Sequence, residues 1–284
     1  MPRIDYFTEA NSVEAVNARM GEATDPRLRE VMAALVRHLH DFVKEVGLTQ
    51  REWEAAIDFL TRTGQLCDAE RQEFILLSDT LGVSMLVDAI AHRRPAGATE
   101  NTVFGPFHVD GAPELPMGSG ISLDGKGESC RYTGRVLDLE GRPLAGARLD
   151  VWSDNSEGFY DVQQPGRQPK WNNRGVFVTG PDGRYDFVGI KPVSYPIPDD
   201  GPVGNMLARL GRHPWRPAHM HFLITHPDHE RIVTHTFVSG DDYLTSDAVF
   251  GVKEALIVDY RKATAGDTTW QVDFDFVMVG ARDD

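Results

Sequence analysis

Apolar residues near the N-terminus recur at the spacing of an amphipathic helix. Between residues 28 and 46 they return every three or four positions, and Gly47 follows the last of them. Asp25 and Pro26 precede the run, and this pair is typical of a helix start because aspartate caps the first turn and proline fits its first position. The pattern therefore predicts a helix that begins at Pro26 and ends before Gly47.

Two further helices are predicted before residue 93. Thr49 and Glu52 form a capping box, and residues 53–60 supply the next apolar stripe. A third stripe begins near Asp68 and continues to Ile90, which predicts one long helix there. Helices with so much apolar surface must bury it, either against another domain or against another subunit.

The pattern changes after a polar connection at residues 93–100, which contains proline and glycine. From there on, short apolar runs alternate with turn residues, which is typical of β-strands. The predicted strands are residues 132–139, 147–152, 175–179, 184–188, 219–225, 232–238, 256–260 and 269–279, with a short helix near 247–254. We expect an α+β chain in which a helical domain of residues 1–100 precedes a mainly antiparallel β-sandwich of residues 101–284.

Composition and charge narrow the class of protein. The 284 residues are 41% hydrophobic and 25% charged, which is ordinary for a soluble globular protein. A net charge of −14 argues against a nucleic-acid partner, because phosphate binding needs a concentrated basic patch. No apolar stretch is long enough for a membrane span, and the N-terminus has no apolar signal region, so we expect a cytoplasmic protein.

The first candidate for chemistry is a pair of histidines at the start of a predicted strand. His219 and His221 are separated by one residue, and the period of two along a strand places both imidazoles on the same face. Such a pair offers two neutral nitrogen donors to iron, copper, zinc or nickel. Two histidines on a solvated strand face would give the same pattern, so the pair alone leaves both interpretations open.

Two tyrosines lie on loops that precede this strand. Tyr160 follows a strand end rich in polar residues and glycine, and Pro196 and Pro198 stiffen the chain around Tyr195. A single tyrosine is most often a half-buried core residue whose hydroxyl is hydrogen-bonded. A β-sandwich could nevertheless bring these two loops together at one end, next to the histidines.

The combination of Tyr160, Tyr195, His219 and His221, with Arg216 just upstream, resembles the signature of the intradiol ring-cleaving dioxygenases. The resemblance implies a non-haem ferric ion, Fe(III), held by the two tyrosinates and the two histidines. It also implies that Tyr195 takes up a substrate proton and that Arg216 stabilises negative charge during the reaction with O2. The same four residues fit neither an ordinary zinc site nor the usual ferrous oxygenase site.

The resemblance extends over nearly the whole chain, including residues 101–113 and 240–252. It implies that the helical part is a linker domain that forms a homodimer interface and holds a phospholipid. A rival interpretation is a non-catalytic sandwich module, similar to transthyretin-like carriers, with a helical dimerisation arm. Such a module would have no need of a four-residue metal set.

Within the family, the chain most resembles the branch that acts on hydroxyquinol, benzene-1,2,4-triol. That branch cleaves the ring between the 1- and 2-hydroxyls with O2 and gives 3-hydroxy-cis,cis-muconate, the enol form of maleylacetate. His235 matches the branch as well, since plain catechol dioxygenases commonly have glutamine at this position. The implied substrate-binding residues are Leu76, Asp79, Val103, Phe104, Gly105, Pro106, Phe107, Ile197, Pro198, Arg216 and Val249.

Asp79 is the residue that would distinguish the triol from a simple catechol. Its carboxylate can accept a hydrogen bond from the third hydroxyl, whereas catechol would leave it unpaired at a cost of about 1–3 kcal/mol. An exposed mid-helix aspartate is the alternative for this residue. Catechol or a chlorocatechol therefore remains the alternative substrate.

Overall fold

The computed structural model describes residues 6–21, 25–68, 71–264 and 268–281. The chain divides into two compact units, Met1–Arg62 and Thr63–Asp284. The domain boundary predicted at residue 100 follows the change from helices to strands, and it stays a prediction. Among the described residues no single helix has the length and apolar composition of a membrane span. Only the helices Glu73–Thr80 and Val83–Ala91 taken together meet these two criteria, and they are bent by 77° where they meet.

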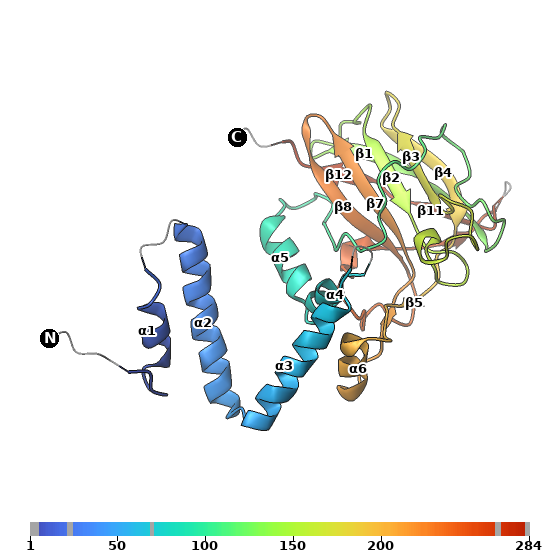
Figure 1. Ribbon diagram of the computed structural model, residues 1–284. Helices are drawn as coiled ribbons and strands as arrows, with labels where there is room; N and C mark the ends of the chain where they lie inside the picture. The colour runs from blue at the N-terminus through green and yellow to red at the C-terminus, as the bar shows by residue number, and fades with distance from the viewer. Residues whose placement is uncertain (1–5, 22–24, 69–70, 265–267, 282–284) are drawn as a thin grey trace. The chain divides into compact units, whose positions relative to one another are not determined.

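The first unit is helical. It contains α1 (Ser12–Asn17), which packs beside α2 (Pro26–Val46), and most of α3 (Gln50–Gln65) (Figure 1). The side chain of Asp25 accepts a hydrogen bond from the backbone N–H of Leu28 at 3.0 Å, and Gly47 ends α2 in the left-handed region at φ 60°. The predicted start and end of this helix are therefore confirmed, whereas α1 was not predicted.

The apolar stripes of α2 and α3 are exposed on this chain. No residue of α2 is buried, although its stripe is as regular as a core-facing helix would need. The exposed apolar residues are Leu28, Val31, Met32, Leu35, Leu39, Phe42, Val43 and Val46 on α2 and Trp53, Ile57 and Leu60 on α3. Continuous apolar surface of this kind is typical of a face that another molecule covers.

The second unit begins with two helices where the sequence predicted one. The predicted helix from Asp68 to Ile90 is wrong, because α4 (Glu73–Thr80) and α5 (Val83–Ala91) meet at an angle of 77°. Gly82 stands at the bend with φ 74°, a left-handed conformation that ends a helix. A further helix, α6 (Pro202–Arg209), was not predicted.

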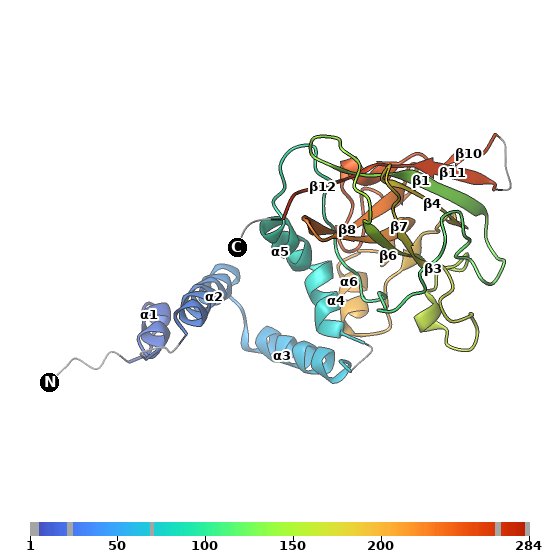
Figure 2. The same cartoon turned by 90° about the horizontal axis from the view of Figure 1, so that it is seen from above.

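Two five-stranded sheets form the rest of the unit (Figures 1 and 2). One contains β1 (Ser129–Asp138), β4 (Arg184–Ile190), β10 (Arg261–Lys262), β11 (Trp270–Asp273) and β12 (Phe276–Met278). The other contains β2 (Arg148–Trp152), β3 (Arg174–Val178), β7 (His219–His226), β8 (His229–Val238) and β9 (Ile257–Val258). The short strands β5 (Tyr195–Pro196) and β6 (Trp215–Arg216) pair separately.

The sheets are mixed. β1 runs parallel to β11 and β12, and β8 runs parallel to β9, while the other pairings are antiparallel. The predicted mainly antiparallel sandwich is thus confirmed, with parallel pairs added where the C-terminal strands return beside β1. The predicted single strand 269–279 is two strands, because the backbone at Phe274 leaves the sheet line and its carbonyl accepts the hydroxyl of Tyr185 at 2.7 Å.

The core between the sheets is built from large rings. Phe187 stacks on Tyr132 with centroids 4.7 Å apart, and Phe222 lies 4.7 Å from Phe276 across the sandwich. Gly134 is required in β1, since a Cβ there would lie 1.9 Å from the carbonyl oxygen of Phe274. This packed core holds β7 in place, and the first residues of β7 include His219 and His221.

The short helix predicted near residues 247–254 is wrong as well. The 3-10 helix in this region covers only Glu254–Leu256. Upstream of it, the side chain of Asp247 accepts the backbone N–H groups of Val249 and Gly251 at 3.3 and 2.9 Å. These bonds take the place of helical hydrogen bonds and fold the segment into a turn.

Candidate metal centre

β7 places two histidines on the same buried face. His219 and His221 are each only 1% exposed, so they are not part of a solvated strand face. Phe237 and His235 on β8 lie opposite them in the strand register. The predicted common orientation of the two imidazoles is confirmed, and the solvated alternative is wrong.

Two tyrosine hydroxyls meet these imidazoles. Tyr160 precedes the 3-10 helix Asp161–Gln163, and its hydroxyl lies 2.9 Å from Nε2 of His221 and 3.3 Å from the hydroxyl of Tyr195. Tyr195 on β5 lies 3.5 Å from Nε2 of His219, and the two Nε2 atoms are 3.1 Å apart. Ligand atoms that share one metal at about 2.0–2.2 Å lie about 3 Å from one another, so the spacing suits a single ion.

The hydrogen bonds of His219 fix its tautomer. Nδ1 lies 2.7 Å from the carbonyl oxygen of Pro217, and because a carbonyl can only accept, Nδ1 carries the proton. Nε2 of His219 therefore presents a lone pair to the cluster. Donation from the second ring nitrogen to a backbone carbonyl is the usual way to orient a histidine that binds a metal.

Burial sets the protonation states of the cluster. It lowers the pKa of His219 and of His221 well below the usual value, so both imidazoles are neutral donors at neutral pH. Burial raises the pKa of Tyr160 and of Tyr195, and the charge of Arg216 opposes this rise at both. Without a metal the tyrosines are phenols, and a cation that binds between them must displace their protons.

Aromatic rings stack on two members of the cluster, His221 and Tyr160. Trp152 stacks on His221 with centroids 4.6 Å apart and an interplanar angle of 13°. Phe107 stacks on Tyr160 at 4.5 Å and 25°. Sequence reasoning missed Trp152, although the strand end at which it stands was predicted. The register that pairs Trp152 with His221 depends on strand pairing, which no local pattern reveals.

His235 forms a second group with the two histidines of β7. The ligand atoms of His219, His221 and His235 all lie within 4.8 Å of one another, and all three residues are buried. The imidazole of His235 lies 4.1 Å from that of His221, centroid to centroid, and stacks on His219 at 4.6 Å. In the four-residue set with the tyrosines, four contacts between ligand atoms run from 2.9 to 3.5 Å.

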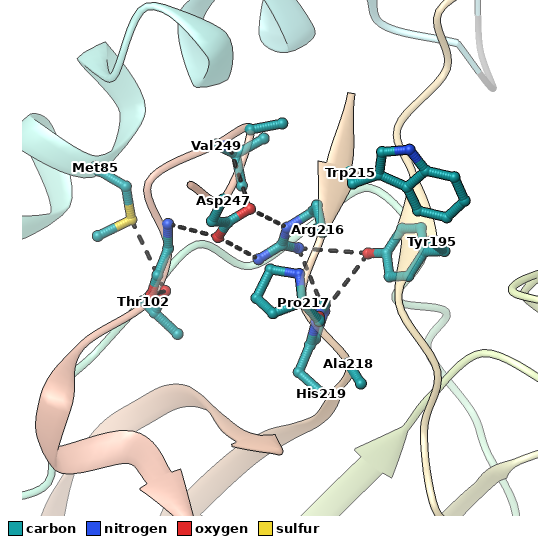
Figure 3. A network of polar contacts seen from close by, with 12 residues as sticks. Met85, Thr102, Tyr195, Trp215, Arg216, Pro217, Ala218, His219, Asp247 and Val249 are labelled. Atoms are coloured by element: carbon teal, nitrogen blue, oxygen red, sulfur yellow. Dashed lines mark hydrogen bonds and ion pairs between the residues drawn. The ribbon is translucent and has the colours of Figure 1, made fainter. Parts of the chain in front are cut away.

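Arg216 lies at the edge of the cluster. Because β5 and β6 pair Tyr195 with Arg216, the guanidinium Nη1 comes within 3.4 Å of the Tyr195 hydroxyl and 3.3 Å of Nε2 of His219 (Figure 3). Burial lowers the pKa of Arg216, but the charge of Asp247 and its hydrogen bonds raise it above the ordinary value overall. Arg216 therefore remains a cation in a buried place.

A cavity of about 980 Å³ reaches the cluster through Tyr195 and Arg216. Ten of the residues predicted for the substrate pocket line it, namely Leu76, Asp79, Val103, Gly105, Pro106, Phe107, Ile197, Pro198, Arg216 and Val249. Phe104 is not in the lining, because its ring lies against His108 and Trp152 instead. Arg71, Gln163 and Lys170 line the cavity too and were not predicted.

The surroundings of two lining residues, Gly105 and Asp79, bear on the site. Gly105 has φ 77°, and a Cβ there would come within 3.2 Å of Cε1 of His221, so the backbone approaches the imidazole closely. Burial raises the pKa of Asp79, while a hydrogen bond from Ser84 and the charge of Arg216 lower it. Asp79 is thus a half-buried carboxyl group whose pKa the charge of Arg216 acts on.

The sequence and the fold can now be compared with known proteins. A family model described as "Dioxygenase" matches residues 110–280, and one described as "Catechol dioxygenase N terminus" matches residues 25–99. The chain is 57% identical to a hydroxyquinol 1,2-dioxygenase of Rhizobium sp. (strain MTP-10005) over 96% of both chains. The chain belongs to the intradiol ring-cleaving dioxygenases.

Two more relatives agree with this assignment. A 6-chlorohydroxyquinol 1,2-dioxygenase of Cupriavidus pinatubonensis is 52% identical, with 96% of this chain and 98% of the relative covered. The solved structure of a hydroxyquinol 1,2-dioxygenase from Pseudomonas putida DLL-E4 superposes with a TM-score of 0.93 at 48% identity and covers 96% of this chain and 99% of that one. This protein is therefore a ring-cleaving enzyme, and the carrier interpretation does not apply.

The buried cluster of this dioxygenase suits a metal ion. Its histidines are neutral, Nε2 of His219 presents a lone pair, and the tyrosine hydroxyls stand at ligand spacing. Nδ1 of His221 is one of several buried polar atoms here without a hydrogen bond in the described part of the chain, together with both ring nitrogens of His235 and Nε1 of Trp152. Stacking on Trp152, in place of a hydrogen bond, holds the imidazole of His221.

Replacing His235 by glutamine is expected to make the free energy of unfolding of the metal-free dioxygenase fall less steeply as the pH is lowered below about 6.5. Burial holds the pKa of His235 well below the unfolded value of about 6.5. The unfolded chain therefore takes up the proton first as the pH falls, so the stability from neutral His235 is complete above about pH 6.5 and is lost below it. The free energy of unfolding of the wild type should lose about 1.4 kcal/mol per pH unit more than that of His235→Gln.

Denaturant unfolding between pH 7.5 and 5.5, with both proteins free of metal, measures this difference. The difference between the two proteins cancels the contributions of ionisable groups far from His235, while that of His221, whose ring lies 4.1 Å away and whose pKa depends on His235, is part of the measured effect. Profiles that run parallel below pH 6.5 would show that His235 is protonated as readily in the folded chain as in the unfolded one.

Proposed function

We propose that this dioxygenase cleaves hydroxyquinol, benzene-1,2,4-triol, between its 1- and 2-hydroxyls with O2 and gives 3-hydroxy-cis,cis-muconate, the enol form of maleylacetate. The observation that carries the proposal is the likeness to the Rhizobium hydroxyquinol 1,2-dioxygenase along 96% of both chains. The half-buried carboxyl group of Asp79 in the wall of the cavity supports it. A ring with a third hydroxyl would give this group a further hydrogen-bond partner.

In this proposal the cofactor is Fe(III), held by Tyr160, Tyr195, His219 and His221. Phenolate oxygens are hard donors that favour the ferric state, and the two imidazoles suit iron. Held by these four residues, a ferric ion would supply the chemistry that activates the bound triol toward O2. Contacts of 2.9 to 3.5 Å between the ligand atoms of these four residues support it.

Tyr195 is the proton acceptor of the proposed mechanism. Its hydroxyl lies 3.4 Å from Nη1 of Arg216 and 3.3 Å from the hydroxyl of Tyr160. Tyr195 lines the cavity, where its oxygen can receive the proton of a substrate hydroxyl. A separate general base is then unnecessary.

Arg216 stabilises the negative charge that develops on the substrate. Its guanidinium lines the cavity beside Tyr195 and stays positively charged through its pairing with Asp247. A fixed cation in a buried place acts with little screening by water and needs no reorientation during the reaction. This role calls for a planar group held at one angle.

Asp79 selects for the third hydroxyl. Its carboxylate already has Ser84 as a partner and can accept the third hydroxyl as well, whereas catechol would leave that second acceptor site empty. A second candidate is a chlorinated hydroxyquinol or a chlorocatechol. It is favoured by the likeness to the Cupriavidus enzyme named for 6-chlorohydroxyquinol and by a cavity of about 980 Å³, which leaves room for a ring substituent.

Oxygen uptake by the iron-loaded enzyme tests the function. We expect a higher kcat/KM for hydroxyquinol than for catechol. Replacing Asp79 by alanine should reduce this preference about 5- to 150-fold, the equivalent of about 1–3 kcal/mol, by removing the acceptor. Asp79→Asn is the matched control, since its amide oxygen still accepts a hydrogen bond and should retain part of the preference.

Either of two results would count against these assignments. A wild-type enzyme that turns over catechol faster than hydroxyquinol would replace the triol by a simple diol as substrate. A preference that stays the same in Asp79→Ala would leave the triol in place but remove Asp79 from its recognition.

The proposal also includes a homodimer formed through the N-terminal helices, with a bound phospholipid. The exposed apolar stripes of α2 and α3 support it, because each leaves a continuous apolar face uncovered on the single chain. A cytoplasmic location, predicted from the sequence, is consistent with an enzyme that acts on a small aromatic substrate.

A further inference from the structure

Asp247 forms a buried ion pair with Arg216, and only Arg216 of the two lines the cavity. Arg216 and Asp247 are 3% and 5% exposed. Nε of the arginine lies 3.1 Å from Oδ1 of the aspartate, and Nη2 lies 3.4 Å from Oδ2 (Figure 3). Two parallel contacts of this kind fix the plane of a guanidinium as well as its position.

The pairing leaves one nitrogen of Arg216 for the active site. Nε and Nη2 face Asp247, whereas Nη1 faces the hydroxyl of Tyr195 and Nε2 of His219 at 3.4 and 3.3 Å. Arginine has a long, flexible stem, and a second carboxyl group is available to it, because both Arg216 and Asp79 line the cavity. The charge of Arg216 acts to lower the pKa of Asp79, while burial, the larger cause, raises it.

Asp247 is itself held by the backbone. Its carboxylate accepts the N–H groups of Val249 and Gly251, and the carbonyl of Gly251 accepts the hydroxyl of Thr102 at 2.7 Å. These bonds close the turn at residues 247–251, where Phe250 has φ 59°. The carboxylate is therefore rigid, and the same turn places Val249 in the cavity wall.

We propose that Asp247 is a positioning residue that holds Arg216 toward Tyr195 and keeps its guanidinium away from Asp79. In this arrangement Arg216 serves the reacting part of the substrate while Asp79 remains free to accept the third hydroxyl. Without the charge of Asp247, the guanidinium would turn to the other carboxyl group in its reach. The inference rests on the proposed function, since it assigns Asp247 a part in both turnover and choice of substrate.

The test is a double-mutant cycle between Asp247→Asn and Arg216→Ala in the iron-loaded enzyme. Asparagine keeps an acceptor oxygen for the turn but removes the charge that orients Arg216. We expect Asp247→Asn to lower kcat for hydroxyquinol about 10- to 100-fold in the wild-type background, and less than about twofold when Arg216 is already alanine. We also expect the preference for hydroxyquinol over catechol to fall at least about threefold, because the Arg216 guanidinium would then pair with the carboxylate of Asp79 and block its contact with the third hydroxyl.

Asp161→Asn is the matched control. Asp161 forms another buried aspartate–arginine pair, with Arg174 at 2.7 Å, and like Arg216 it lines the cavity, but it does not contact Arg216 in any described hydrogen bond or ion pair. Its effect on kcat should be the same whether or not Arg216 is present. Iron content and thermal unfolding of each variant separate a loss of fold from a loss of orientation, and Asp247→Glu, which keeps the charge, should recover part of the kcat.

The possible results distinguish the inference from the function on which it rests. A wild type that consumes no oxygen with hydroxyquinol would overturn the proposed function. An active wild type, with Asp247→Asn lowering kcat equally in both backgrounds and leaving the substrate preference unchanged, would show that Asp247 only shapes the fold and would overturn the inference alone. A folded, iron-loaded Asp247→Asn with wild-type kinetics would do the same.

Discussion

Replacing Tyr160 by phenylalanine is expected to remove most of the iron and the visible colour from the enzyme. The Tyr160 hydroxyl lies between Nε2 of His221 at 2.9 Å and the Tyr195 hydroxyl at 3.3 Å, so its loss leaves a gap in the middle of the ligand set. We expect metal affinity to fall more than about 100-fold, beyond the usual cost of changing a residue that only orients a ligand. Turnover should fall with it.

The fold should survive this change. Phenylalanine keeps the ring, and with it the stacking on Phe107 at 4.5 Å. Iron per chain and the visible absorption spectrum, before and after hydroxyquinol is added without oxygen, measure the effect. The wild type should show a tyrosinate-to-iron absorption band that shifts with substrate, and the variant should lack it.

Tyr185→Phe is the matched control for Tyr160→Phe. Tyr185 is also buried, and its hydroxyl donates to the carbonyl oxygen of Phe274 at 2.7 Å, outside the cluster. Its loss should cost about 1 kcal/mol of stability and leave iron and colour unchanged. If Tyr160→Phe kept full colour and turnover, the ligand set with two tyrosines would be refuted.

Features that depend on residues close together in the sequence were predicted correctly. The capping aspartate and the glycine after Val46 predict both ends of α2, and both are confirmed. The period of two along β7 predicts that His219 and His221 point the same way, and this is confirmed too. Each of these features depends on residues within a few positions of one another.

Signals that depend on distant residues were missed. The apolar pattern of α4 and α5 is continuous, so it gave no sign of the 77° bend at Gly82, where a Cβ would meet the ring of Phe250 at 3.5 Å. Trp152 supports His221 only because β2 and β7 pair in one register. Phe104 was placed in the pocket by resemblance, but it packs against Trp152 instead.

One error of local reasoning and one feature of the site have the same cause. A short helix is predicted near residues 247–254, but Phe250 has φ 59°, outside the helical region, and the side chain of Asp247 accepts the backbone N–H groups of Val249 and Gly251. The turn that results points the same carboxylate at Arg216. A side chain that competes with the backbone thus anchors the cation of the active site, and no helical pattern could have revealed this.

Replacing Arg216 by alanine is expected to leave the iron in place and to lower kcat about 10²- to 10³-fold. Arg216 contacts Tyr195 and His219 at 3.4 and 3.3 Å without being one of the four ligands, so the metal set keeps all its donors. What is lost is a preorganised positive charge beside the reacting carbon atoms, and the loss of one such group has an effect of this size. Oxygen uptake, iron content and the visible spectrum of the variant measure it.

The stability of Arg216→Ala gives a second measure of the same pair. Removing the arginine leaves the carboxylate of Asp247 buried with only backbone partners, which should cost about 3–5 kcal/mol of unfolding free energy. Adding Asp247→Asn should recover part of that stability without restoring turnover. Arg216→Lys supplies a charge but not the planar fork that Asp247 fits, so its kcat should lie between those of alanine and arginine. An undiminished rate in Arg216→Ala would remove this residue from the chemistry and leave its pairing with Asp247 as a matter of folding alone.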